Sequence, residues 1–258
     1  MTSKGTEQGS LLYETLHQQN QALREELANL DDENQADFAL LVDTTRRLQA
    51  TSASIKAAVS SLLNYDILWD ASNQHEFLET INISVDLLTQ LVTLLALRFR
   101  VEAGELELKC EKQSLQEIIS AVQVKLLKSG FEQPLDVSFT SGGKLVFVDY
   151  GYLIASLELL IGAISSRAGL RKIHITTKEQ PKNWLVSFVD IDPELAQAIQ
   201  VKNLDKKKFI ANTHLPSENI LKLYTALDLL RIQDIRVNLV DMQDGKHILN
   251  LAVPVADS

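Results

Sequence analysis

The chain has 258 residues and a formal net charge of −9, with 45% hydrophobic and 23% charged residues. This length suits about two folded domains, and the composition excludes wholesale disorder. The negative charge disfavours nucleic acid as a partner and disfavours electrostatic attachment to a membrane, because both need a basic surface. A single cysteine, Cys110, excludes an internal disulfide and a cysteine-ligated metal site. With a polar N-terminus and no uninterrupted apolar run, the chain is predicted to be cytoplasmic and not to span a membrane.

Residues 1–36 are predicted to form a polar tail followed by a short coiled coil. Leu16, Leu23 and Leu30 are seven residues apart, which is the spacing of a coiled-coil seam. The segment holds fewer than the ~3 to 4 heptads that identify a coiled coil firmly. A single helix packed on its own domain is therefore the alternative.

Residues 37–104 are predicted to form a helical hairpin whose two arms each carry an apolar stripe in steps of three and four. The stripes are Phe38, Leu41, Thr45, Leu48, Ser52, Ile55, Val59 and Leu62, then Phe77, Ile81, Val85, Leu88, Val92, Leu95 and Phe99. Two helices cannot bury stripes of this width between them, so we expect two copies to form a dimeric four-helix bundle. The residues expected to contact the second copy or a partner are Ser52, Ile55, Val59, Leu62, Phe77, Ile81, Leu88 and Leu95.

Residues 105–258 are predicted to alternate between strands and helices. Strands are expected at 106–110, 135–139, 145–148, 172–178, 184–189, 235–241 and 247–253, and helices at 115–127, 153–164, 193–201 and after Ser217. The strands at 135–139 and 145–148 are expected to be joined by the Gly142-Gly143 turn, and Ser217 is expected to cap the last helix. This order of elements predicts an α/β sandwich.

Three segments of the hairpin carry a resemblance to a known family. They are Ser54-Ile55-Lys56-Ala57-Ala58-Val59, His75-Glu76-Phe77-Leu78-Glu79-Thr80-Ile81 and Arg100-Val101-Glu102-Ala103-Gly104-Glu105-Leu106-Glu107-Leu108. They resemble the dimerisation domain of sensor histidine kinases, and the order of elements after residue 105 resembles the ATP-binding domain of that family. The resemblance implies an α+β protein in which a long helical hairpin forms a dimeric four-helix bundle, followed by an α/β sandwich resembling the histidine kinase ATP-binding domain.

The residue that accepts phosphate in this family is absent. The resemblance places Thr45, Arg46 and Arg47 on the serine, the histidine and the acidic residue of the family's phosphoacceptor box. Arginine stays protonated and has no free nitrogen lone pair with which to attack a phosphoryl group. The candidate base beside the histidine is lost as well.

The resemblance also locates the nucleotide motifs, and these positions hold other residues. The family's magnesium-binding helix carries two asparagines four residues apart, where this chain has Glu158 and Gly162. The adenine-binding turn is represented by residues 190–194, which keep a vestigial aspartate, Asp190, and lose both glycines. No glycine occurs between Leu170 and Asp244, so the glycine-rich loop that would cradle phosphate is missing. The chain is therefore expected to bind no cofactor and no metal ion.

These features predict a degenerate pseudo-histidine kinase that is not an enzyme. It would act as a homodimeric scaffold that binds a response regulator, a kinase or another signalling protein. The expected docking surface is the flank of residues 52–63 together with the start of the second helix, and the alternative is that this face is merely solvated. One alternative function is a degenerate histidine phosphotransferase, with His75 as a displaced acceptor, or a kinase remnant that binds ATP weakly. Another is a coiled-coil assembly element.

Overall fold

The computed structural model describes residues 40–62, 71–129, 131, 133–140, 142–168, 172–200, 209–242 and 246–256. Two compact units are present, one of residues 40–200 and 214–258, the other of residues 1–39 and 201–213. The predicted coiled coil and the hairpin tip at residues 63–70 lie outside the described residues. In the second unit, residues 209–212 are helical and the Thr213 N–H donates to the Phe209 carbonyl (2.8 Å).

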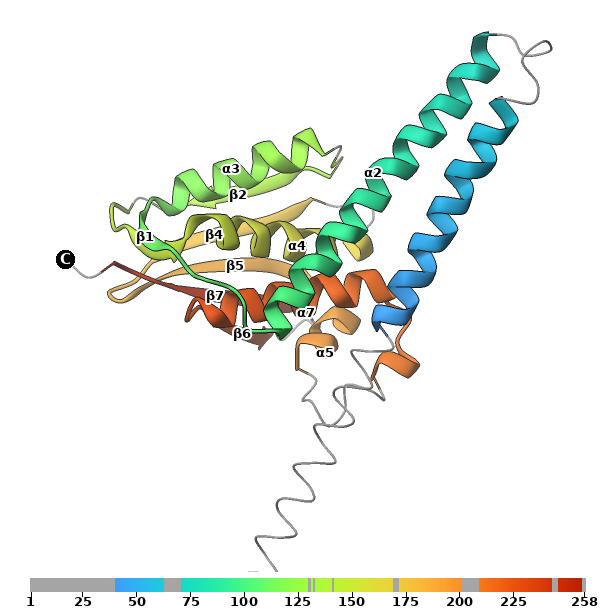
Figure 1. The fold of residues 1–258 in the computed structure, drawn as a ribbon. Coiled ribbons are helices and arrows are strands. Elements are labelled where there is room, and N and C mark those ends of the chain that lie inside the picture. Colours follow the sequence, from blue (N-terminus) through green and yellow to red (C-terminus); the bar gives the residue numbers. More distant parts are fainter. Residues whose placement is uncertain are drawn as a thin grey trace, which may run out of the picture. The chain divides into compact units, whose positions relative to one another are not determined.

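Two antiparallel helices form the predicted hairpin. Residues 40–62 are helical, and α2 spans Ala71–Glu102 beside them (Figure 1). The α2 helix ends in a turn in which Gly104 adopts φ +66°, a conformation that favours glycine. Burial along α2 is uneven: residues 74–90 are exposed or half-exposed, whereas Leu91, Leu94 and Arg98 are buried. The hairpin therefore has a covered base and an uncovered distal half.

The rest of this unit is built on a five-stranded sheet in the order β2-β4-β5-β7-β6. Its strands are β2 (Leu135–Phe139), β4 (Ile173–Glu179), β5 (Asn183–Ile191), β6 (Arg236–Asp241) and β7 (His247–Pro254). All neighbouring pairs are antiparallel except β2 and β4. A separate two-stranded sheet pairs β1 (Cys110–Gln113) with β3 (Val146–Asp149).

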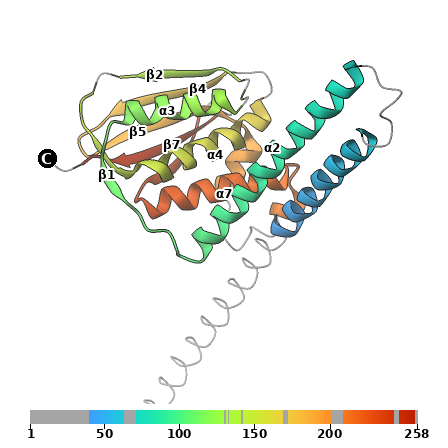
Figure 2. The same ribbon diagram turned by 45° about the horizontal axis from the view of Figure 1, so that its top comes forward.

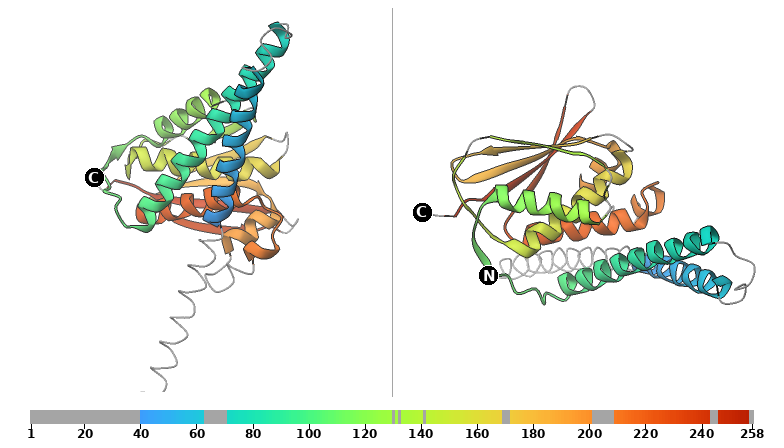
Figure 3. Two further views of the ribbon diagram at one scale, coloured as in Figure 1. Left: turned by 45° about the vertical axis from the view of Figure 1, so that its right-hand side comes forward. Right: turned by 90° about the horizontal axis from the view of Figure 1, so that it is seen from above.

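Three helices cover one face of the five-stranded sheet (Figures 2 and 3). They are α3 (Leu115–Lys128), α4 (Tyr150–Ala168) and α7 (Ser217–Ile232), and α4 packs against both of the others. Alternate residues of β4, β5 and β7 point to this face, among them Ile175, Phe188 and Leu251, which are fully buried beneath the helices. The predicted α/β sandwich is confirmed. The short helix α5 (Pro193–Gln200) follows β5.

Three local predictions are wrong. The first strand begins at Cys110 rather than at residue 106, because the Lys109 N–H is taken by Asp149 Oδ2 (2.8 Å). The strands β2 and β3 belong to different sheets, so the Gly142-Gly143 segment does not close a hairpin. The N-cap of α7 is Pro216, which has no side-chain hydrogen bond to offer, and Ser217 is already helical.

Gly142 is fixed by a close approach to an aromatic ring. A Cβ atom on Gly142 would lie 2.5 Å from Trp184 Cη2 and closer still to Glu179 Oε2. Trp184 cannot retreat easily, because its ring is buried and its Nε1–H donates to the Lys144 carbonyl (2.9 Å). Gly143, the next residue, has no atom within 4 Å of the same position.

We therefore predict that Gly142→Ala destabilises the protein by about 1–3 kcal/mol, the usual cost of overpacking a rigid site. Gly143→Ala is the matched control and should leave stability unchanged, because its methyl group meets open space. Urea denaturation followed by circular dichroism measures both variants. Equal unfolding midpoints would show that the Trp184 ring yields to the methyl group.

Candidate functional site

The turn that carries Arg46 lies in the basal half of the first hairpin helix. The Arg46 side chain is 75% exposed, and its nearest acidic partner is Asp43, 3.9 Å away one turn earlier. The neighbouring Thr45 hydroxyl donates to the Leu41 carbonyl (2.8 Å). An exposed guanidinium thus occupies the position matched to the phosphoacceptor.

Arg47 points to a different part of the chain. Its Nη1 donates to Glu218 Oε2 on α7 at 2.5 Å, and Glu218 Oε1 also pairs with Lys222 Nζ at 2.5 Å. Glu218 is buried, so its two cationic partners offset the cost of removing the carboxylate from water. The residue matched to the family's acidic position is therefore a structural cation. No local sequence pattern indicates this pair, because its members are 171 positions apart.

The helix matched to the magnesium site, α4, has its key positions engaged by lysines. Glu158 Oε2 lies 2.6 Å from Lys125 Nζ on α3. One turn later, a Cβ atom on Gly162 would lie 3.8 Å from Lys222 Cδ, so the stem of Lys222 passes beside this glycine. Glu158 meets a cation here, and that cation is a side chain of the same domain.

The turn matched to adenine binding is closed by internal bonds. Asp190 adopts φ +63°, a left-handed conformation that aspartate tolerates better than most residues, and its carboxylate pairs with Lys246 (3.0 Å). Asp192 Oδ1 accepts from the N–H groups of Glu194 (3.0 Å) and Leu195 (3.3 Å) and so caps α5. The turn and the helix cap are thus formed by two different aspartates, Asp190 and Asp192.

The remaining titratable groups suggest no other chemistry. His75 is exposed near the start of α2, while the His174 and His247 rings lie 3.1 Å and 2.8 Å from Asp136 and Asp241. In the described ranges, no three His, Cys, Asp or Glu side chains gather closely enough to hold a metal ion. Burial, and then the charge of Asp149, raise the pKa of the Cys110 thiol, which keeps it in the less reactive protonated form.

The residues expected at the dimer or partner interface lie on the uncovered part of the hairpin. Ser52 and Val59 are exposed, and the other six, Ile55, Leu62, Phe77, Ile81, Leu88 and Leu95, are half-exposed. A stricter pattern was missed: Leu78, Val85, Val92 and Phe99 are seven residues apart and each is at least 43% exposed. With Ile81, Leu88 and Leu95 three residues after the first three, they form the a and d positions of a coiled-coil seam. We call these seven residues the α2 seam.

The segment Gln74–Glu102 of α2 is also long and apolar enough to cross a membrane, judged by length and composition. A spanning helix is apolar around its whole circumference, whereas a bundle helix keeps a polar side. On α2 the side away from the seam carries Glu79, Asp86, Gln90 and Thr93, all exposed. The pattern of α2 is typical of a bundle helix.

No protein-family model matches the sequence, and no curated protein is similar to it. Solved structures do match. A histidine kinase of Acinetobacter baumannii, AdeS, is 14% identical with a TM-score of 0.57, over 82% of this chain and 98% of that one. Full-length ShkA in complex with AMPPNP is 14% identical with a TM-score of 0.55, over 85% of this chain and 46% of that one.

A third structure, the histidine kinase ThkA in complex with the response regulator TrrA, is 17% identical with a TM-score of 0.52, over 90% of this chain and 67% of that one. At identities this low the likeness concerns the fold. The match includes the hairpin as well as the sandwich, since each of these alignments covers more than four fifths of the chain. The chain therefore has the histidine kinase fold, a helical hairpin followed by an ATPase-like α/β domain.

Proposed function

We propose that this protein is a catalytically inactive, histidine-kinase-like homodimer that serves as a scaffold for a signalling partner. The same observation, made at the phosphoacceptor position, the magnesium helix and the adenine turn, carries the proposal. At each position where a kinase needs chemistry, the side chain is unsuited to it or is engaged in a structural bond. Arg46 cannot accept a phosphoryl group, Glu158 is paired with Lys125, and Asp192 caps a helix.

Nucleotide binding is opposed by charge as well as by the missing glycines. Glu158, Asp190 and Asp192 stand at the positions matched to the magnesium helix and the adenine turn. Carboxylates close to a triphosphate oppose its binding unless a metal ion lies between them. Gly162 offers no ligand atom for such a metal, and Glu158 already has a cationic partner.

We predict that magnesium-ATP gives no saturable rise in Tm and that labelled ATP leaves no phosphate on the chain, because a ligand raises Tm only by binding the folded state. Arg46→His should also stay unlabelled, since restoring the acceptor does not restore the ligands missing at Glu158 and Gly162. A thermal-shift titration and a phosphorylation assay measure the two effects. Saturable stabilisation by ATP, or a label that His75→Ala abolishes, would establish the alternative of a kinase remnant or a phosphotransferase.

The proposed homodimer rests on the uncovered α2 seam. A seam of seven apolar residues on a helix whose distal half has no buried residue exposes apolar surface to water. Two copies would then bury both seams in a four-helix bundle.

We predict that Val92→Glu converts the dimer to a monomer, because it places a charge at the centre of the buried seam. Gln90→Glu, two residues away on the solvent side of α2, introduces the same side chain and should leave the dimer intact. Sedimentation equilibrium gives the mass of each variant. A dimer that survives Val92→Glu would exclude the α2 seam as the interface.

For the partner, we propose a receiver domain of a response regulator docked on the flank of residues 52–63. ThkA, a protein of the same fold, was crystallised with its response regulator, which supports a partner of this class. The flank is accessible, since Ser52, Lys56 and Ser60 are all exposed. The alternative partner for the same surface is another kinase or an unrelated signalling protein.

We predict that at least one receiver domain from the host binds, and that Lys56→Glu weakens binding about tenfold, equivalent to about 1.4 kcal/mol. Lys178→Glu makes the same charge change on an exposed position of β4 and should leave the affinity unchanged. Isothermal titration calorimetry measures both variants. Absence of binding to every receiver domain of the host would refute the receiver as partner while leaving the dimer prediction standing.

A further inference from the structure

Helix α7 is buried on two opposite sides, which is unusual for a helix on the outside of a sheet. Ile220, Leu223 and Leu230 form the side expected to face the interior, and all are fully buried. A second stripe, Glu218, Leu221, Thr225 and Asp228, follows steps of three and four and lies on the opposite side of the helix. Leu221 and Thr225 are also buried, at 2% and 0% exposure. Something other than the sheet therefore covers this second stripe.

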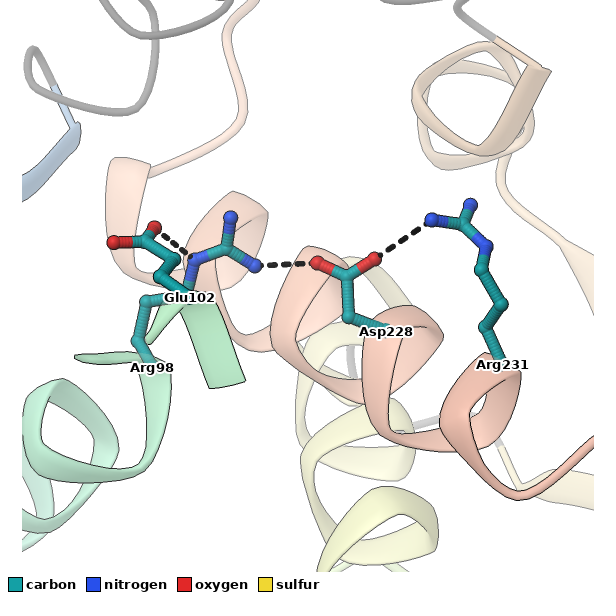
Figure 4. Close-up of polar contacts among 4 residues, drawn as sticks. All are labelled: Arg98, Glu102, Asp228 and Arg231. Carbon is teal, nitrogen blue, oxygen red and sulfur yellow. Dashed lines mark hydrogen bonds and ion pairs between the residues drawn. The ribbon is translucent and has the colours of Figure 1, made fainter. Parts of the chain in front are cut away.

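One end of the second stripe is bound to α2. Asp228 Oδ2 accepts from Arg98 Nη1 at 2.6 Å, and Arg98 Nε donates to Glu102 Oε1 at 2.7 Å (Figure 4). The Arg98 side chain is only 5% exposed. The other oxygen of Asp228 lies 3.1 Å from the exposed Arg231. Burying a guanidinium to this extent costs free energy, and the cost is offset only while carboxylates pair with it.

The other end of the stripe is bound to the first hairpin helix. Glu218 pairs with Arg47 at 2.5 Å, so the two acidic residues of one α7 stripe bind one arginine from each hairpin helix. Glu218 and Asp228 are ten residues apart, which corresponds to about 15 Å along a helix. Leu221 and Thr225 lie between them and are covered from the same direction.

The base of the hairpin also contains buried residues. The buried residues at its base, Leu40, Thr44, Leu91, Leu94 and Arg98, lie in the same part of the two helices as Arg47. The α2 helix contacts α7, and an ion pair joins each end of the second stripe to the hairpin. We call Arg47–Glu218 and Arg98–Asp228 the interdomain ion pairs.

We propose that the interdomain ion pairs hold the α/β domain in one fixed arrangement on the base of the hairpin, so that this domain is a rigid support rather than a mobile one. Separating α7 from the hairpin would take Asp228 away from Arg98 and Arg47 away from Glu218, and it would expose Leu221. The fixed arrangement depends on neither nucleotide nor a partner protein and so goes beyond the scaffold function. It also keeps partners away from the side of the hairpin base that faces α7.

Distances between two spin labels test this arrangement directly. The single cysteine is replaced by Cys110→Ser, and labels are attached at Gln90→Cys on α2 and Lys178→Cys on β4, both exposed positions. Labelled chains are mixed with an excess of unlabelled protein, so that only distances within one chain are recorded. Pulsed electron paramagnetic resonance should give one narrow distance distribution.

The variant that removes both carboxylates, Glu218→Gln with Asp228→Asn, should broaden the distribution or add a second population. Arg47→Gln, which changes a half-exposed side chain, is the milder second variant and should broaden it too. Lys125→Gln is the matched control, because it breaks a 2.6 Å ion pair inside the α/β domain and should leave the distribution narrow. Circular dichroism confirms that helix content is retained. A broad distance distribution in the labelled protein without further substitutions would overturn the proposal. So would a distribution that stays narrow both in the carboxylate variant and in Arg47→Gln.

Discussion

The buried guanidinium of Arg98 is the constraint on which the arrangement of the hairpin and the sandwich depends. Removing an arginine from water is costly, and the cost is offset only where carboxylates reach it with good geometry. Glu102 supplies one partner from the same helix, which fixes the rotamer of Arg98. Asp228 supplies the other from α7, and that bond is available in only one position of α7 along α2. A hydrophobic contact alone would tolerate sliding between the two helices, whereas this ion pair specifies their register.

Several replacements relative to the kinase pattern are connected through α7. Arg47, at the position of the family's acidic residue, holds Glu218. Glu218 also holds Lys222, whose stem lies beside Gly162 on α4, at the position of a family asparagine. The changes on the hairpin and in the sandwich therefore belong to one chain of contacts.

Much of the architecture could be predicted because its helices and strands follow from the local spacing of apolar residues. The apolar steps of three and four along the hairpin and the alternation along β4 and β5 need no knowledge of distant residues, and the order of elements was largely correct. The β2–β3 connection was predicted wrongly because β2 pairs in parallel with β4, and no local pattern reports a parallel partner. The interdomain ion pairs could not be predicted either, since their members are 171 and 130 positions apart and each side chain is unremarkable in its own segment.

The closeness of Lys222 to Gly162 links a glycine of the sandwich to the hairpin. A Cβ atom at residue 162 would lie 3.8 Å from Lys222 Cδ, which is ordinary van der Waals contact. A longer side chain at residue 162 would extend into the space beside the Lys222 stem. Displacing Lys222 would withdraw one of the two cations that neutralise the buried Glu218, and Glu218 also binds Arg47 of the first hairpin helix. The size of the side chain at residue 162 therefore bears on how firmly the first hairpin helix is held against α7.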